Sequence, residues 1–266
     1  MSDYIEICEK AARAGGAVVQ DWIGRFDVKE KAPADLVTEA DFASQQAVRR
    51  IILDVFPDHC VLGEEEDDDD DDGDAASDFR WIVDPLDGTI NYVHRVPFYA
   101  VSLALEHAGK LVAGVVYDPN NGECFSAVAG GGAALAGQPI RVSGATEMSA
   151  ALAAVGFPPG ASHDSPDLAL FNEVMPKCQA IRRTGSCALN LCYMAAGRFD
   201  VFWSFGAKIW DVAAGVLILE EAGGTITAPD GGPFQLEKAH FLAAATGQLH
   251  GELQRLAGKA LPSRGE

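Results

Sequence analysis

The sequence predicts an α+β half followed by an α/β half, and two observations lead to this prediction. Strand-like runs between residues 79 and 128 are joined by short turn segments, which is typical of an antiparallel meander. Beyond about residue 146, strand-like and helix-like runs alternate along the chain, which is typical of α/β structure. We therefore expect two subdomains, residues 1–145 and 146–266, that meet at a soft boundary.

Two helices and a short strand are expected before the meander. Apolar residues recur at helical spacing over 3–24, and again from Thr38 to about residue 55. Thr38 is a helix-capping residue type, and Pro57 ends the second helix. An extended piece ending at Pro33 separates the helices, and residues 60–62 form a short buried strand. The strands of the meander are expected at 79–83, 98–105, 111–117 and 123–128, and glycines at 130–132 and 137 end the sheet.

The second half gives a regular alternation of helices and strands. Gly197 and Gly223 follow two of the helices, as expected of residues that end a helix. No internal repeat or flexible linker interrupts the pattern. Strands are expected at 151–155, 179–183, 199–203, 225–227 and 241–244, and helices at 166–177, 186–196, 210–222 and 248–257.

The composition argues against several classes of partner. The 266 residues include 20 Lys and Arg and 39 Asp and Glu, so the net charge is −19, and its field repels nucleic acid and anionic membrane surfaces. No apolar run reaches the roughly 20 residues that span a bilayer, and acidic residues occupy the N-terminus where a signal peptide needs an apolar run. The six scattered cysteines form no CxxC pair, which predicts neither a zinc site nor a disulfide framework. We expect a cytoplasmic protein.

Nine consecutive acidic residues, from Glu64 to Asp72, form the most unusual segment. A block of like charges repels itself and is usually solvated. We expect the part from Asp67 to Asp72 to lie in a mobile loop and to supply no metal ligand.

The turn after the predicted 79–83 strand carries the most informative motif. Asp84 ends this strand, Pro85 stiffens the turn, and Asp87 follows three residues after Asp84. Gly88 allows a ligand to approach the backbone, and the amides of Gly88 and Thr89 can face an anion. Two carboxylates beside free amides suit hard cations that hold a phosphate. An ordinary acidic turn explains this pair equally well when it is taken alone.

Three further carboxylates have structural interpretations when each is taken alone. Glu64 follows the 60–62 strand, but it also begins the acidic run. Asp211 begins a helix and can act as its N-cap. Asp41 stands three residues after Thr38, as in a capping box.

Taken together, these segments resemble the inositol monophosphatase family, which belongs to the magnesium-dependent, lithium-sensitive sugar and nucleotide phosphatases. The resemblance covers nearly the whole chain, and the matching segments keep their order and spacing. They are Asp35-Leu-Val-Thr-x-x-Asp41, Gly63-Glu64-Glu65, Trp81-Ile-Val-Asp84-Pro-Leu-Asp-Gly-Thr89-x-Asn91, and Trp210-Asp211-Val-Ala-Ala-Gly215 with Glu221-Ala-Gly-Gly224. The fold that the resemblance implies is the layered αβαβα sandwich of the sugar phosphatase type, usually a homodimer.

The resemblance also implies a role for each matching residue. Two to three Mg²⁺ ions are expected: the first held by Glu64, Asp84 and the backbone carbonyl of Leu86, the second by Asp84, Asp87 and Asp211, and a third assisted by Glu64. Thr89 paired with Asp41 helps to activate a water on the first metal, so the implied catalytic residues are Glu64, Thr89 and Asp41. The amides of Gly88 and Thr89 hold phosphate oxygens. Arg182, Arg183, Gly185 and Ser186 match a family segment near the substrate and the dimer contact.

Two positions depart from the family pattern near the expected substrate. Ser204 stands seven residues before Asp211, where many members carry a Glu that binds inositol hydroxyls, and we expect it at the mouth of the site. Lys208 adds a cation that many members lack. His94 follows the metal loop, and we expect it to pack or support rather than to catalyse.

The sequence thus predicts a Mg²⁺-dependent phosphomonoesterase that hydrolyses inositol monophosphate or a similar small phosphomonoester with a metal-activated water. Two alternatives stay open. One is the same chemistry on histidinol phosphate, a sugar phosphate or a nucleotide 3′-phosphate. The other is an acidic cation-binding protein without catalysis.

Overall fold

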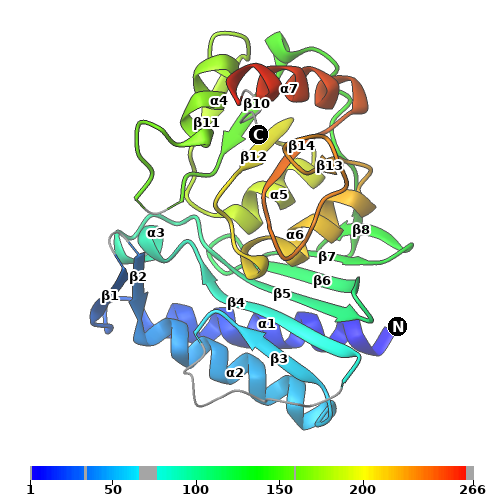
Figure 1. Ribbon diagram of the computed structural model, residues 1–266. Coiled ribbons are helices and arrows are strands. Elements are labelled where there is room, and N and C mark those ends of the chain that lie inside the picture. The colour runs from blue at the N-terminus through cyan, green and yellow to red at the C-terminus, as the bar shows by residue number, and fades with distance from the viewer. Residues whose placement is uncertain (1, 33–34, 66–76, 159, 262–266) are drawn as a thin grey trace.

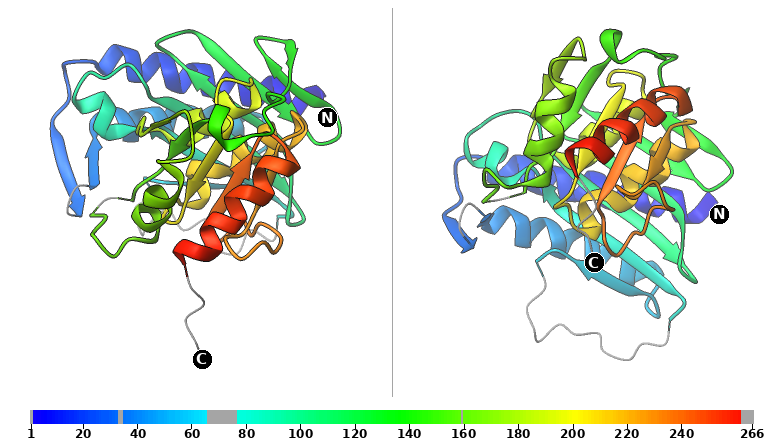
Figure 2. Two further views of the ribbon diagram at one scale, coloured as in Figure 1. Left: turned by 90° about the horizontal axis from the view of Figure 1, so that it is seen from above. Right: turned by 45° about the horizontal axis from the view of Figure 1, so that its top comes forward.

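Five layers of helices and sheets stack on one another in the computed structural model, which describes residues 2–32, 35–65, 77–158 and 160–261 (Figure 1). Two N-terminal helices cover one face of a seven-stranded sheet, and two further helices cover its other face. A five-stranded sheet and a last pair of helices complete the stack. Figure 2 shows that the N-terminal helices and the C-terminal helix form opposite outer layers. This arrangement confirms the predicted αβαβα sandwich.

The outer layer at the N-terminus consists of α1 (Ser2–Trp22) and α2 (Glu39–Val55). Their apolar faces are buried against each other and the sheet; Cys8 and Ala12 of α1 and Ile52 of α2 are fully buried. Thr38 caps α2 as predicted. The extended piece between the helices is an antiparallel hairpin of β1 (Val28–Ala32) and β2 (Asp35–Thr38), and all five residues of β1 are exposed.

The seven-stranded sheet contains the predicted meander and extends beyond it. The strand order follows the sequence, β3 pairs in parallel with β4, and every other pair is antiparallel. Gly130, Gly132 and Gly137 do not end the sheet, because their positive φ angles form tight turns before two further short strands. The strands are β3 (Cys60–Gly63), β4 (Phe79–Asp87), β5 (Ala100–His107), β6 (Lys110–Asp118), β7 (Glu123–Val128), β8 (Gly132–Leu135) and β9 (Gln138–Ile140).

The second half forms the remaining three layers. Its sheet has the order β11-β10-β12-β14-β13, with β10 parallel to both of its neighbours and the last three strands antiparallel. These strands are β10 (Leu152–Val155), β11 (Ala180–Arg182), β12 (Val201–Ser204), β13 (Thr225–Thr227) and β14 (Phe241–Ala244). The helices are α4 (Pro166–Val174) and α7 (Gly247–Ala260) outside, and α5 (Cys187–Ala195) and α6 (Ile209–Glu221) between the sheets. A 3₁₀ turn, Met148–Ala150, precedes β10.

Small residues allow α6 to approach its neighbours closely. A Cβ added to Gly114 of β6 would lie 3.1 Å from Cα of Ala214, and one added to Gly215 would lie 2.7 Å from Cβ of Leu191 on α5. The buried core around α5 and α6 therefore fixes the position of α6, and with it the place of Asp211 in its first turn.

Two further findings concern the cysteines and the helices. All six cysteines are free thiols. Among the described residues, no helix combines the length and hydropathy that a membrane span requires.

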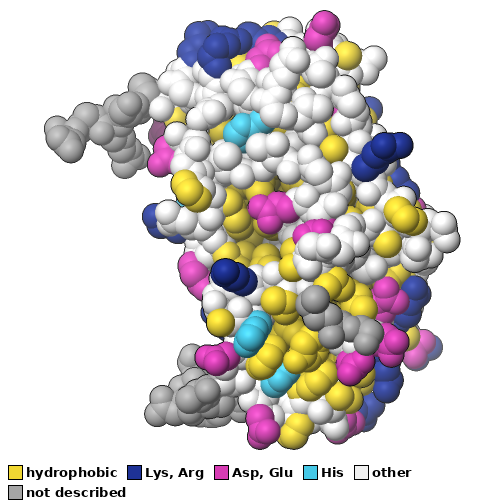
Figure 3. Space-filling view, turned by 90° about the vertical axis from the view of Figure 1, so that its right-hand side faces the viewer, with side chains coloured by type: hydrophobic (Ala, Val, Ile, Leu, Met, Phe, Trp, Pro, Cys, Tyr) yellow, Lys and Arg dark blue, Asp and Glu magenta, His cyan; other side chains and the backbone are white. Residues whose placement is uncertain are grey.

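The face on the right of Figure 1 carries a band of hydrophobic side chains with charged side chains around it (Figure 3). The short helix α3 (Thr89–Val93), which borders the candidate site, lies on the left of Figure 1.

Candidate active site

A pocket of about 340 Å³ lies where the two halves of the chain meet. Segments far apart in the sequence bound it: the turn after β4, the start of α5, the chain after β10, and the loop between β12 and α6. Most residues of the predicted site line it, namely Glu64, Asp87, Gly88, Thr89, Gly185, Ser186, Ser204 and Asp211. Asp41, Asp84 and Leu86 do not line the pocket but are buried next to residues that do.

The turn from Asp84 to Thr89 is built around a bulge and a left-handed glycine. The pairing of β4 with β5 shifts register between Asp84 and Asp87. The amide of Leu86 donates to Oδ1 of Asp84 at 3.0 Å, and Asp84 is 1 % exposed. Gly88 has φ 100°, and an added Cβ would lie 3.1 Å from the carbonyl oxygen of Phe98. The short helix α3, which the sequence did not predict, begins immediately after Gly88, so its first amides lack acceptors within the helix.

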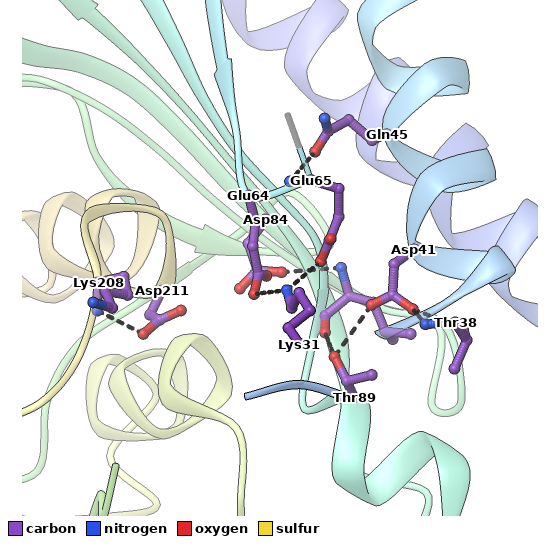
Figure 4. A network of polar contacts seen from close by, with 11 residues as sticks. Lys31, Thr38, Asp41, Gln45, Glu64, Glu65, Asp84, Thr89, Lys208 and Asp211 are labelled. Atoms are coloured by element: carbon purple, nitrogen blue, oxygen red, sulfur yellow. Dashed lines mark hydrogen bonds and ion pairs between the residues drawn. The ribbon is translucent and has the colours of Figure 1, made fainter. Parts of the chain in front are cut away.

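Asp41 links the cap of α2 to the hydroxyl of Thr89 (Figure 4). Its Oδ2 accepts hydrogen bonds from the amide and the hydroxyl of Thr38, at 2.9 and 2.7 Å. Its Oδ1 accepts one from Thr89 Oγ1 at 3.2 Å, and the same hydroxyl lies 3.0 Å from the Leu86 carbonyl oxygen. Burial raises the pKa of the Asp41 carboxyl to about 6, although its hydrogen bonds oppose this shift. Asp41 therefore makes both the capping-box contact with Thr38 and the contact with Thr89 that the resemblance implies.

Asp87 joins the two halves of the chain. Its carboxylate accepts hydrogen bonds from the Ser186 hydroxyl, from the Cys187 amide at 3.1 Å and from the Ala188 amide at 2.8 Å. These donors form the N-terminus of α5, where a negative charge is favourable. Burial raises the pKa of Asp87 to about 6 against the effect of these donors.

The remaining acidic residues contact local donors. Asp211 accepts a hydrogen bond from the backbone amide of Lys208 at 2.7 Å. The ammonium of Lys31 forms ion pairs with Glu64 at 3.0 Å and with Glu65 at 2.7 Å (Figure 4). Lys31 was not predicted from the sequence, because β1 is an exposed strand of alternating charge and nothing in its pattern indicates a contact with Glu64 or Glu65.

The chemistry and charge of this cluster fit Mg²⁺. Every candidate ligand is an oxygen, which this ion prefers. Burial, followed by the charges of Glu64, Asp87 and Asp211, raises the pKa of Asp84 well above its usual range. Burial and the charge of Asp87 raise the pKa of Asp211 likewise. No basic side chain among the described residues forms an ion pair with Asp84, Asp87 or Asp211, so a bound cation would compensate their repulsion.

The same side chains do not enclose an ion as they stand. In the described ranges, no three His, Cys, Asp or Glu side chains converge closely enough to hold a metal. Their hydrogen-bond and ion-pair donors explain this arrangement, because Lys31, the start of α5 and the Lys208 amide draw Glu64, Asp87 and Asp211 toward different neighbours. Metal binding would thus require these carboxylates to turn toward a common centre.

The predicted substrate contacts are only partly brought together. Arg182 is exposed and does not line the pocket, whereas the next residue, Arg183, does. Gly185 has φ 92° and packs on Asn91, whose amide donates to the carbonyl oxygens of Phe98 and Thr184 at 2.7 and 2.8 Å. Ser204 is 4 % exposed, so it lies within the wall and not at the mouth where we expected it.

Two other expectations concern residues near the site. His94 is exposed at the end of α3 and is not among the pocket residues. The segment from Asp67 to Asp72, expected to be a mobile loop without ligands, lies outside the described residues.

Comparison with known proteins gives a consistent result over the whole chain. The profile of the inositol monophosphatase family matches residues 1–261. A Pseudomonas aeruginosa protein named Nus factor SuhB is 41 % identical over 92 % of this chain and 93 % of its own length. An inositol-1-monophosphatase of Mesorhizobium japonicum is 37 % identical over 88 % of each chain. The crystal structure of the extragenic suppressor protein SuhB from Bartonella henselae has a TM-score of 0.90 and 37 % identity, covering 97 % of this chain and 99 % of its own.

Proposed function

Because this chain belongs to the inositol monophosphatase family, we propose that it is a Mg²⁺-dependent phosphomonoesterase acting on inositol monophosphate or a similar small phosphomonoester. The observation that carries this proposal is the group of buried and half-buried carboxylates that surround the pocket beside the Thr89–Asp41 pair. Hydrolysis of such esters is among the slowest uncatalysed reactions, and a water nucleophile needs both activation and an electrostatic clamp on the phosphate. This pocket offers residues for both tasks.

The metal ligands we propose are the carboxylates of Glu64, Asp84, Asp87 and Asp211 and the carbonyl of Leu86, for two to three Mg²⁺ ions. When bound, the ions would lower the pKa of a water and neutralise charge on the phosphate and on the leaving alkoxide. This also explains how a protein of net charge −19 binds an anionic substrate, because bound cations reverse the local sign of the field.

Thr89 and Asp41 are suited to orient the attacking water and to accept its proton. The Thr89 hydroxyl has one proton, which lies near Asp41 Oδ1 and the Leu86 carbonyl, and lone pairs that can accept a hydrogen bond from water. As the water attacks phosphorus, Thr89 can accept a proton from it and pass its own to Asp41. The two donors from Thr38 hold the other oxygen of Asp41, so Oδ1 stays directed at Thr89.

Backbone amides can hold the phosphate oxygens next to this pair. Gly88, Thr89 and Ile90 line the pocket at the start of α3, and a side chain at position 88 would be strained in the left-handed conformation that Gly88 adopts. Phosphate binding here leaves the opposite wall of the pocket for the alcohol part of the substrate.

A phosphate-release assay over a panel of small phosphomonoesters tests the proposal. Wild-type protein should release phosphate with Mg²⁺ and not in chelator. Thr89→Ala should lower kcat by about 100-fold or more, since a positioned proton acceptor contributes about 10²–10⁴-fold. Thr225→Ala, in β13 and outside the pocket, is the matched control and should keep the wild-type rate. Full turnover in chelator, or an unchanged kcat in Thr89→Ala, would contradict the proposal.

A second candidate function comes from the name of the 41 % identical relative, Nus factor SuhB. The net charge of −19 disfavours direct contact with nucleic acid, so we propose that a role as a Nus factor would depend on a protein partner. Complementation of a bacterial strain that lacks its own SuhB protein tests this role. Wild-type protein is compared there with the catalytically impaired Thr89→Ala variant. Equal rescue by both would separate this role from phosphatase activity, and no rescue by either would refute it.

A further inference from the structure

Three parallel strands end on one side of the pocket. β10 lies between β11 and β12 and is parallel to both, so their carboxyl ends share one edge of the sheet. Ligands bind beyond such edges in many α/β proteins. The chain that follows each strand supplies the outer wall of the pocket: Arg183 follows β11, Phe157 and Pro158 follow β10, and Lys208 follows β12. Two basic residues therefore flank an apolar centre.

Close packing holds this wall in place. A Cβ added to Gly206 would lie 2.5 Å from Cβ of Pro158, so the loop that precedes Lys208 fits directly against the chain after β10. Asp167 of α4 accepts a hydrogen bond from the amide of Phe205 at 2.9 Å, which holds the start of the same loop. The wall is thus formed before any substrate binds.

The two basic residues of the wall have no ion-pair partner among the described residues, although Lys208 feels the charge of Asp211 at longer range. Arg183 and Lys208 are exposed, and neither side chain forms an ion pair within the part of the chain that the structure describes. Other basic residues do find acidic partners, for example Arg198 with Glu123. Among the described residues, all acidic side chains that line the pocket belong to the proposed metal cluster, so this part of the wall offers no further carboxylate to accept hydrogen bonds from ring hydroxyls.

We propose that this wall binds the alcohol part of a phosphomonoester that carries a second anionic group, a carboxylate or a second phosphate, between Arg183 and Lys208. The inference rests on the proposed phosphatase function and names its substrate class. A neutral polyol would leave Arg183 without an anionic partner and Lys208 with only the longer-range charge of Asp211, and it would find no charged acceptor at Ser204. The second anion should therefore act mainly through KM, because the groups that carry out the chemistry lie at the other end of the pocket.

Two matched pairs of substrates test the inference. Glycerol 2-phosphate and 2-phosphoglycerate differ by one hydroxymethyl group replaced by a carboxylate, and inositol 1-phosphate and inositol 1,4-bisphosphate differ by one phosphate. Wild-type protein should favour the more anionic member of at least one pair by about tenfold in KM, the effect of one charged hydrogen bond. Lys208→Met and Arg183→Met should remove most of this preference and leave the KM of the less anionic member nearly unchanged. The pair that responds tells which second anion is bound.

Two control variants remove a positive charge outside the pocket. Arg182→Met changes the neighbour of Arg183, and Lys110→Met changes the exposed first residue of β6; both should keep the wild-type preference. Lys208 also lies close enough to Asp211 to favour its ionised form, which gives a competing explanation of its role. That explanation predicts that Lys208→Met lowers kcat/KM equally for both members of each pair. An equal loss of kcat/KM, or an unchanged preference for the more anionic member, would overturn the inference. Absence of hydrolysis of every substrate by wild-type protein would instead refute the proposed function.

Discussion

The structure predicts that Asp87→Asn and Asp211→Asn differ in stability although both should abolish activity. Each variant removes one carboxylate charge that we propose for metal binding, so kcat should fall by orders of magnitude in both. Their other contacts differ. Asp87 accepts three hydrogen bonds from the start of α5, whereas Asp211 accepts one, from the amide of Lys208.

The expected magnitude follows from these donors. An asparagine has a single acceptor oxygen, which at position 211 can keep the bond from the Lys208 amide. At position 87 its NH₂ group must face one of the donors of α5, and a buried amide left without a partner costs about 1–3 kcal/mol. Both variants also remove a charge that repels the Asp84 carboxylate and raises its pKa. The relief of this repulsion is common to the two variants, so it does not contribute to the difference in their stability. Asp87→Asn should therefore be about 1–3 kcal/mol less stable than Asp211→Asn.

Urea denaturation in chelator at pH 8 measures this difference without a contribution from bound metal. Phosphate release with Mg²⁺ measures activity in parallel, and wild-type protein in chelator is the reference. Equal unfolding free energies for the two variants would refute the reasoning, because they would mean that the contacts of Asp87 with α5 do not hold the two halves together.

Four further predictions follow from other contacts and from the proposed metals. Mg²⁺ should raise the Tm of wild-type protein in a concentration-dependent way, and Li⁺ should inhibit turnover; a Tm that does not respond to Mg²⁺ would count against the metal cluster. Burial raises the pKa of Asp167 to about 6, so the native carboxyl binds more protons than the unfolded one between about pH 4 and 6. The free energy of unfolding should fall by up to about 3 kcal/mol as pH rises through this window, relative to Asp167→Asn, as measured by urea titrations at several pH values. Gly185→Ala should destabilise the protein by about 1–3 kcal/mol and raise KM, because φ is 92° and the added Cβ would lie 2.7 Å from Asn91 Nδ2; thermal unfolding and steady-state kinetics measure both effects, and a variant as stable as wild type would contradict it.

The sequence predicts the long elements of this fold well, because hydrophobic periodicity determines them locally. Helix α2 begins after Thr38 and ends at residue 55 as expected, and strand β7 matches its predicted bounds. The short elements β2, β8, β9 and α3 were not predicted. They contain only three to five residues, and their structure depends on pairing partners and on glycine turns that place them against the rest of the sheet.

The candidate site shows the same limit in its contacts. The motifs identify Asp84, Asp87 and Asp211 by type and spacing, but they do not show that Asp87 meets α5 about a hundred residues later in the chain. Arg182 and Arg183 are equivalent in the sequence, and only the direction of the chain after β11 decides that Arg183 faces the pocket. The contact of Lys31 with Glu64 depends on where an exposed hairpin lies, which no local pattern records.

The structural and functional interpretations of these carboxylates are not exclusive, and there is a physical reason for this. A carboxylate that acts in a buried pocket must be held in one orientation, and backbone amides at helix starts are the donors best placed to hold it. Asp41 completes the capping box of α2 with one oxygen and directs the other at Thr89, and Asp87 accepts hydrogen bonds from the amides of α5 while lining the pocket. A capping pattern therefore does not argue against a catalytic role. For Asp41, the combination indicates which oxygen is held at the start of α2 and which is left to accept a hydrogen bond from Thr89.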